Sequence, residues 1–186
     1  MKIILAFIIS MGLYAFTPKT ETPKYFTREA NVTLLSNTPL EKIEGINNQV
    51  VSILDISTGA LEFSVLMKAF EFKKALLQEH FNENYVESDK FPKSTFKGTI
   101  TNLKEVKWTI DGEYPVDVIG KFILHGVTKD IAIKGKITLT KGVISSSSTF
   151  NILLSDYNIS IPPVVKDKIN KTVKIDVFSI YKPYQG

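Results

Sequence analysis

The chain contains no cysteine. This absence excludes disulfide bonds, thiol catalysis, cysteine-ligated zinc and a lipid-modified N-terminal cysteine. Arginine is nearly absent too, because Arg28 is the only one and the remaining positive charges are scattered lysines. Nucleic-acid binding usually needs clustered arginine and lysine, so the sequence does not favour a nucleic-acid partner. A chain without disulfides must be held together by its core alone.

Histidine is also scarce, since His80 and His125 are the only two. Glu79 and Glu83 lie beside His80, so a site of two histidines and a carboxylate would form if the fold brought His125 nearby. No spacing in the sequence requires such a site, and the chain has no GxSxG, HExxH, P-loop or GxGxxG motif. We therefore expect no metal, no cofactor and no catalytic residue.

The N-terminal residues differ from the rest of the chain. Residues 1–16 place Lys2 before an apolar stretch shorter than the roughly 20 residues of a membrane-spanning helix. This pattern is typical of a secretory signal peptide, so we expect a periplasmic or secreted protein. Residues 17–29 are expected to form a linker, and residues 30–186 a single domain. Because Lys2 is the only charged residue in the signal, its removal would lower the formal net charge from +4 to +3.

Most of the expected domain has the period of β-strands. The alternation is clearest between Asp130 and Thr140, where isoleucine or leucine alternates with lysine, alanine or threonine. Eight or nine such segments, each with one apolar face, favour a closed antiparallel barrel. Lys97, Lys121, Lys134 and Lys136 lie on the opposite phase from the apolar side chains. The apolar side is therefore expected to face inward rather than toward a membrane.

Turn residues divide the expected strands, with breaks at 37–39, 47–48 and 57–59. The first four strands and the last one are expected at Asn31–Ser36, Glu41–Asn47, Val50–Asp55, Ala60–Met67 and Thr172–Tyr181. One segment has helical spacing instead and predicts a short helix over 73–81. Its apolar side would serve either as a plug at one end of the barrel or as a lid over a cavity.

The interior of an eight-stranded barrel is just wide enough to be filled by side chains or to hold one slender ligand. The pattern of apolar and polar residues does not distinguish these two cases. In a hollow barrel, an apolar tail would gain about 0.8 kcal/mol for each CH₂ removed from water. The side chains expected to line the ligand are Phe63, Val65, Phe70, Phe72, Leu76, Leu77, Phe81, Phe91, Phe96, Ile100, Val118, Phe122, Leu124 and Ile133, with Phe150 as a further candidate. The lysines expected to neutralise an anionic head group are Lys73, Lys74, Lys90 and Lys93.

Five segments, in order along nearly the whole expected domain, resemble the YceI-like family of lipid-binding proteins. They are residues 30–48 (ANVTLLSNTPLEKIEGINN), 55–72 (DISTGALEFSVLMKAFEF), 75–98, 125–129 (HGVTK) and 155–162 (SDYNISIP). The resemblance implies an all-β, eight-stranded antiparallel barrel of lipocalin-like form, here with a short helix after the fourth strand. It also implies an elongated apolar pore that holds a polyisoprenoid or a similar amphiphile, and an exported setting. It implies no catalytic residue.

The leading interpretation is a protein that binds, sequesters or transports such a lipid, and transient membrane contact and a homodimer are left open. The alternative is a lipid-modifying enzyme that uses the barrel as a reaction chamber. Its acid or base would come from His125, Asp156 or Glu113. A cluster of titratable groups pointing into the cavity would distinguish the enzyme from the binding protein.

Overall fold

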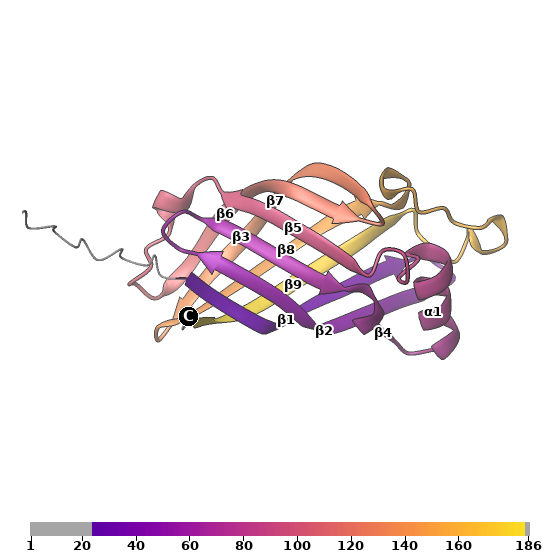
Figure 1. Ribbon diagram of the computed structural model, residues 1–186, viewed down its shortest axis with the longest axis horizontal. Helices are drawn as coiled ribbons and strands as arrows, with labels where there is room; N and C mark the ends of the chain where they lie inside the picture. The colour runs from indigo at the N-terminus through magenta and orange to yellow at the C-terminus, as the bar shows by residue number, and fades with distance from the viewer. Residues whose placement is uncertain (1–23, 185–186) are drawn as a thin grey trace, which may run out of the picture.

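The computed structural model of the protein describes residues 24–184 and consists almost entirely of antiparallel strands (Figure 1). The expected signal peptide and the first part of the expected linker lie outside these residues. The strands are β1 (Lys24–Asn37), β2 (Lys42–Asp55), β3 (Ala60–Leu66), β4 (Glu71–Phe72), β5 (Lys93–Ile100), β6 (Gly112–Leu124), β7 (Val127–Thr140), β8 (Val143–Leu153) and β9 (Thr172–Pro183). The helical segments are α1 (Ala75–His80), a π-helical turn at Phe81–Tyr85, and 3₁₀ turns at Met67–Ala69, Leu103–Glu105, Leu154–Tyr157 and Pro163–Val165.

Eight of the strands form a closed barrel. The order around it is β1, β9, β8, β7, β6, β5, β3 and β2, and pairing between β2 and β1 completes the circle. The ninth strand, β4, is an addition of two residues that pairs with Gly45 and Ile46 of β2. The expected all-β, eight-stranded antiparallel barrel with one short helix is therefore confirmed.

The start of the barrel differs from the expectation in two ways. β1 begins at Lys24, so residues 24–29 are part of the barrel wall and not of a linker. β2 also runs without a break through Asn47, where the sequence predicted a turn. Ala30 pairs with Val50 and Val32 pairs with Asn47, which leaves one extra residue on β2 and makes a bulge.

Asn47 explains why the sequence resembled a turn at this point. Its side chain is fully buried, donates a hydrogen bond from Nδ2 to the Leu66 carbonyl at 2.9 Å, and accepts one at Oδ1 from the backbone N–H of Gln49 at 2.9 Å. Asparagine commonly makes such local bonds to the backbone in turns. Here the same bonds stabilise a bulge in a continuous strand.

The expected helix is present but shorter, because Lys74 is still extended and α1 begins at Ala75. The helix continues directly into the π-helical turn that begins at Phe81. The Phe81 ring packs against Phe70 and Phe72, with ring centroids 5.4 Å and 4.9 Å apart. These aromatic contacts attach the helical segment to the barrel.

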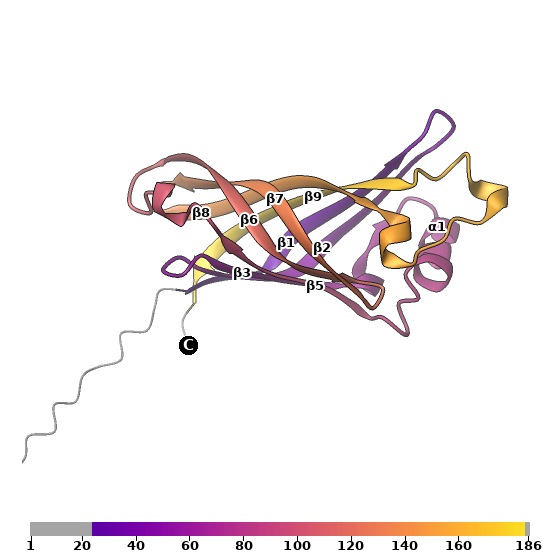
Figure 2. The ribbon, with the colours of Figure 1, turned by 90° about the horizontal axis from the view of Figure 1, so that it is seen from above.

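The two ends of the barrel are different (Figures 1 and 2). One end, called the helical end below, carries α1, the β1–β2 hairpin and the segment between β8 and β9. The other, called the terminal end below, brings the two ends of the described chain together, and Tyr184 donates a backbone hydrogen bond to the Lys24 carbonyl at 2.8 Å. Among residues 24–184, no helix has both the length and the apolar character needed to cross a membrane.

The outer surface of the barrel carries the lysines that the sequence placed out of phase with the core. Lys97, Lys121, Lys134 and Lys136 each form an ion pair with an acidic residue at 2.7–3.1 Å. Their outward position confirms that the apolar faces of these strands point into the barrel. Such exposed pairs contribute little stability, typically below about 1 kcal/mol each, so the core must provide most of it.

Candidate functional site

The barrel encloses a cavity of about 250 Å³. Each of the eight barrel strands contributes inward-facing side chains to its wall. A space of only about 10–15 Å³ is enough to hold one water molecule, so this cavity is far larger than a packing defect. The structure therefore answers the question that the sequence left open, because the barrel is hollow and not filled.

The wall of the cavity is almost wholly apolar. Twelve of the fourteen side chains that we expected to line a ligand are part of it, namely Phe63, Val65, Phe70, Phe72, Leu77, Phe81, Phe96, Ile100, Val118, Phe122, Leu124 and Ile133. Phe150 lines it as well. Alternation places the lining residues of each barrel strand on its inner face, and closure of the barrel brings these faces together. The helical segment and the residues before it add Phe70, Phe72, Leu77 and Phe81.

The other two predicted lining residues lie elsewhere. Leu76 is 60% exposed, because α1 has fewer than two turns and its inner face is already occupied by Leu77 and by Phe81, which follows the helix. Phe91 packs against the ring of His125, with centroids 4.7 Å apart, and against Gly126. Phe91 therefore belongs to a contact outside the cavity.

Sequence reasoning also missed part of the wall. The inward residues of β9, Val173, Ile175 and Val177, line the cavity and show the same alternation as the strands that we did nominate, so periodicity could have found them. Val165 and Ile169, from the segment between β8 and β9, line it too. The apolar residues of their segment recur with neither the spacing of a strand nor that of a helix, so the sequence did not identify them as lining residues.

The four lysines predicted to bind a head group are not brought together at the cavity. All four are exposed and none is part of the wall. Lys74 instead pairs with Glu41 at 3.0 Å, and Lys90 lies 4.9 Å above the Phe91 ring. Lys73 and Lys74 precede α1, Lys90 lies in the loop after the helical segment, and Lys93 is the first residue of β5. At all four positions the side chain is directed to solvent.

The charged and titratable residues at the helical end of the cavity are different ones. Glu41 of the β1–β2 hairpin, His80 of α1 and Lys168 between β8 and β9 form part of the wall there. Tyr85 lines the cavity nearby, and burial raises the pKa of its hydroxyl. This phenol therefore stays neutral at ordinary pH and offers a hydrogen-bonding group without charge.

The three residues considered for catalysis do not converge. Glu113 pairs with Lys136 at 2.7 Å on the outside of the barrel, and Asp156 is exposed. His125 is held at both ring nitrogens, Nε2 by a Glu87 carboxylate oxygen at 2.6 Å and Nδ1 by the Tyr157 carbonyl at 3.0 Å. None of the three catalytic candidates lines the cavity.

The part of the chain that the structure describes contains no group of three histidine or acidic residues placed to hold a metal ion. The two histidines have separate surroundings. His80 lines the cavity, whereas His125 is occupied by Glu87 and by the Tyr157 carbonyl. The site is thus an apolar chamber with a few polar groups at one end.

Solved structures with this architecture include several bacterial proteins. A polyisoprenoid-binding domain from Saccharophagus degradans, implicated in plant cell wall breakdown, has a TM-score of 0.77 at 12% identity, covering 88% of this chain and all of that one. BcnA from Burkholderia cenocepacia has a TM-score of 0.67 at 12% identity, covering 82% of this chain and 96% of its own. A YceI protein from Campylobacter jejuni has a TM-score of 0.55 at 17% identity, with coverages of 74% and 81%. At these identities the likeness shows the fold.

A comparison with curated proteins found no match. The model of one protein family, described as the YceI-like domain, matches residues 27–178. This range includes nearly all of the barrel, from β1 into β9, and every residue of the cavity wall. The chain belongs to the YceI-like family.

Proposed function

We propose that this protein binds a long-chain amphiphile, such as a polyisoprenoid, and sequesters or transports it with the apolar tail inside the barrel. The observation that carries the proposal is the cavity of about 250 Å³ with an almost wholly apolar wall. Membership of the YceI-like family and the likeness to a domain described as polyisoprenoid-binding support it.

The wall suits an apolar tail for an energetic reason. Each CH₂ moved from water to the cavity would contribute about 0.8 kcal/mol, and no charged partner inside the cavity is needed. Glu41, His80 and Lys168 at the helical end would leave a polar head in contact with water and with both signs of charge. Binding is favoured over catalysis because His125, Asp156 and Glu113 lie away from the cavity wall.

The test uses the described wall and a matched outer position. Leu34 of β1 lines the cavity, and its neighbour Leu35 does not. In Leu34→Trp the indole would occupy part of the cavity. Displacing only two CH₂ groups of a bound tail would cost about 1.6 kcal/mol, roughly a fifteenfold loss of affinity. Leu35→Trp should bind like the unaltered protein.

Native mass spectrometry after incubation with a mixture of polyprenols and fatty acids would measure uptake, and titration of the ligand taken up would give the affinities. Circular dichroism would establish that both variants are folded. Failure of the unaltered protein to retain any lipid would overturn the proposal. Equal binding by the two tryptophan variants would show that the lipid lies outside the cavity.

A further inference from the structure

The barrel wall is not continuous between β7 and β8. These strands pair from Gly135 opposite Ser148 to Thr140 opposite Val143. Toward the helical end, residues 127–134 of β7 pair only with β6, and residues 149–153 of β8 pair only with β9. Within residues 24–184, no residue of one stretch is a pairing partner of a residue of the other. Figure 1 shows the β6–β7 ladder arching over the top of the barrel.

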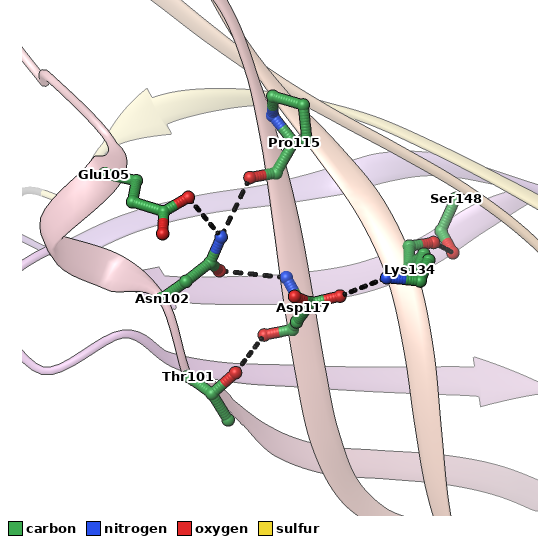
Figure 3. Close-up of polar contacts among 7 residues, drawn as sticks. All are labelled: Thr101, Asn102, Glu105, Pro115, Asp117, Lys134 and Ser148. Carbon is green, nitrogen blue, oxygen red and sulfur yellow. Dashed lines mark hydrogen bonds and ion pairs between the residues drawn. The ribbon is translucent and has the colours of Figure 1, made fainter.

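The point of separation is closed by side chains. The hydroxyl of Ser148 donates a hydrogen bond to the Lys134 carbonyl at 3.0 Å, immediately beyond the last paired residues. The Lys134 ammonium is held by Asp117 at 2.9 Å, and Asp117 is held in turn through its backbone N–H by Asn102 (Figure 3). The first of these bonds joins β8 to β7 at the end of their pairing, and the other two attach β7 to β6 and β6 to the loop after β5.

A second cavity, called the lateral cleft below, lies where the strands have separated. Its volume is about 280 Å³, and its wall consists of residues 129–133 of β7, residues 150–153 of β8, Asp156 and Tyr157. The surroundings are mixed, with charged groups from Lys129 and Asp130 beside apolar side chains. A space with both polar and apolar surroundings suits the passage of an amphiphile, which has a polar and an apolar part.

The lateral cleft and the central cavity share a wall. Ile133, Phe150 and Ile152 line both. Ile133 and Phe150 are only partly buried, whereas Ile137 and Leu139, where the ladder is intact, are 1% and 3% exposed. The barrier between the two spaces is therefore a layer of single side chains.

Phe150 is the side chain best placed to open this barrier. Its ring packs edge-on against Phe122, with centroids 6.2 Å apart, and Phe122 packs in the same way against Tyr157 at 5.5 Å. Tyr157 lines the lateral cleft and Phe122 lines the central cavity. Rotation of one partly exposed aromatic side chain is fast compared with domain motion, so Phe150 can move without a rearrangement of the strands.

We propose that the lateral cleft is a portal through which the tail of a long-chain amphiphile enters and leaves the central cavity. The proposal rests on the proposed function. The tail would pass Phe150 on its way between the lateral cleft and the central cavity.

The absence of cysteine permits a clean test. A double variant, Ala132→Cys with Asn151→Cys, places thiols on opposite edges of the lateral cleft, where a short bis-maleimide can bridge them. The matched control is Thr138→Cys with Ser145→Cys, a pair directly opposed in the intact ladder. Stopped-flow fluorescence would measure uptake and release of cis-parinaric acid, a fluorescent fatty acid, before and after bridging.

We expect the bridge across the lateral cleft to slow uptake and release by about tenfold while the equilibrium affinity stays the same, because a portal changes rates and not the bound state. Bridging the control pair should leave both rates unchanged. Phe150→Ala should accelerate release, and Phe178→Ala, on the outer face of β9, should not. Normal uptake with rates unaltered by the first bridge would overturn the portal and leave the proposed function intact. No uptake by the unbridged proteins would overturn both.

Discussion

At the scale of single residues, a glycine pair determines how closely two strands approach. Gly98 of β5 and Gly120 of β6 are directly opposed. A Cβ on Gly120 would lie 2.4 Å from the Lys97 carbonyl oxygen and 2.5 Å from the Gly98 Cα, and the Phe96 ring lies across the same place. The missing side chains thus leave room for the ring of Phe96, which is part of the cavity wall.

Gly120→Ala should therefore destabilise the protein by about 1–3 kcal/mol, the usual range for overpacking a core. The backbone of β5 cannot move away without disturbing its pairing with β3 as well as with β6. Gly112→Ala is the matched control, because its nearest neighbour would be the flexible end of Tyr114 at 3.2 Å. Urea denaturation of both variants measures the difference, and equal stabilities would contradict this account.

Single residues also show what the sequence could predict. Alternation along the strands was enough to place residues such as Phe63 and Val118 in the cavity wall, since closing the barrel turns every apolar face inward. It was not enough for Leu76 and Phe91, whose positions depend on the length of α1 and on a contact with His125. Nor could it place the lysines, because charge alone does not reveal which loop reaches the cavity.

At the scale of elements, His125 joins three separate segments of the helical end. It lies in the β6–β7 turn with a φ of 49°, and it contacts Glu87 after the π-helical turn and the Tyr157 carbonyl after β8. The Phe91 ring packs on the same imidazole. One side chain thus holds the segment after α1 against the barrel.

His125→Asn is expected to release this segment without straining the turn, because asparagine tolerates positive φ. Loss of the contact with Glu87 should increase amide hydrogen exchange in residues 86–91, while exchange in β2 remains as before. Hydrogen–deuterium exchange with mass spectrometry would detect the change. His125→Ala would add backbone strain, so a comparison of the two variants separates the lost contacts from the strain. Unchanged exchange in residues 86–91 of His125→Asn would show that other contacts hold them.

The strand type of most elements followed from the sequence, but two features of their continuity and pairing did not. The continuity of β2 depends on two bonds of the Asn47 side chain, a local one from the N–H of Gln49 and one to the carbonyl of Leu66, nineteen residues away. The second bond cannot be read from the local sequence. The separation of β7 from β8 cannot be recognised from the alternation of apolar and polar residues, because Ile131 and Ile133 alternate with polar or small residues as regularly as Ile137 and Leu139 do. Periodicity specifies the face of a residue and not the strand beside it.

At the scale of the whole molecule, the terminal end of the barrel is closed by a buried polar cluster. The Tyr181 hydroxyl, on a side chain only 3% exposed, lies 2.9 Å from the Ser52 hydroxyl and 3.3 Å from that of Ser146. Burial raises the pKa of Tyr181, and the hydrogen bonds from neighbouring serines oppose this only in part. Ser146 lines the cavity, whereas Ser52, Leu54 and Tyr181 are buried and do not, so the cluster lies at the boundary of the cavity toward this end.

The raised pKa of Tyr181 predicts how global stability depends on pH. In the unfolded chain the Tyr181 hydroxyl ionises near pH 10, whereas in the folded protein its pKa is higher. The contribution of the neutral Tyr181 to the free energy of unfolding is therefore complete below pH 10 and is lost as the pH rises further. Each pH unit above that point can remove at most about 1.4 kcal/mol.

Tyr181→Phe should lose about 1–2 kcal/mol at pH 7, because two hydrogen bonds disappear. It should also show a shallower decline between pH 10 and pH 11 than the unaltered protein. Urea denaturation at both pH values would measure this, with Tyr184→Phe, at an exposed position, as the control. A decline as steep as that of the unaltered protein would mean that Tyr181 does not titrate on unfolding.

The contact between Lys24 and Tyr184 has a consequence for how the chain could be rearranged. Because the first and last strands of the barrel are neighbours, the pairing around it is closed and does not depend on which strand comes first in the chain. A short peptide linking these two positions, with new ends opened at the turn of Lys141 and Gly142, would give a circular permutant with the same neighbours around the ring. Only the order of synthesis would change.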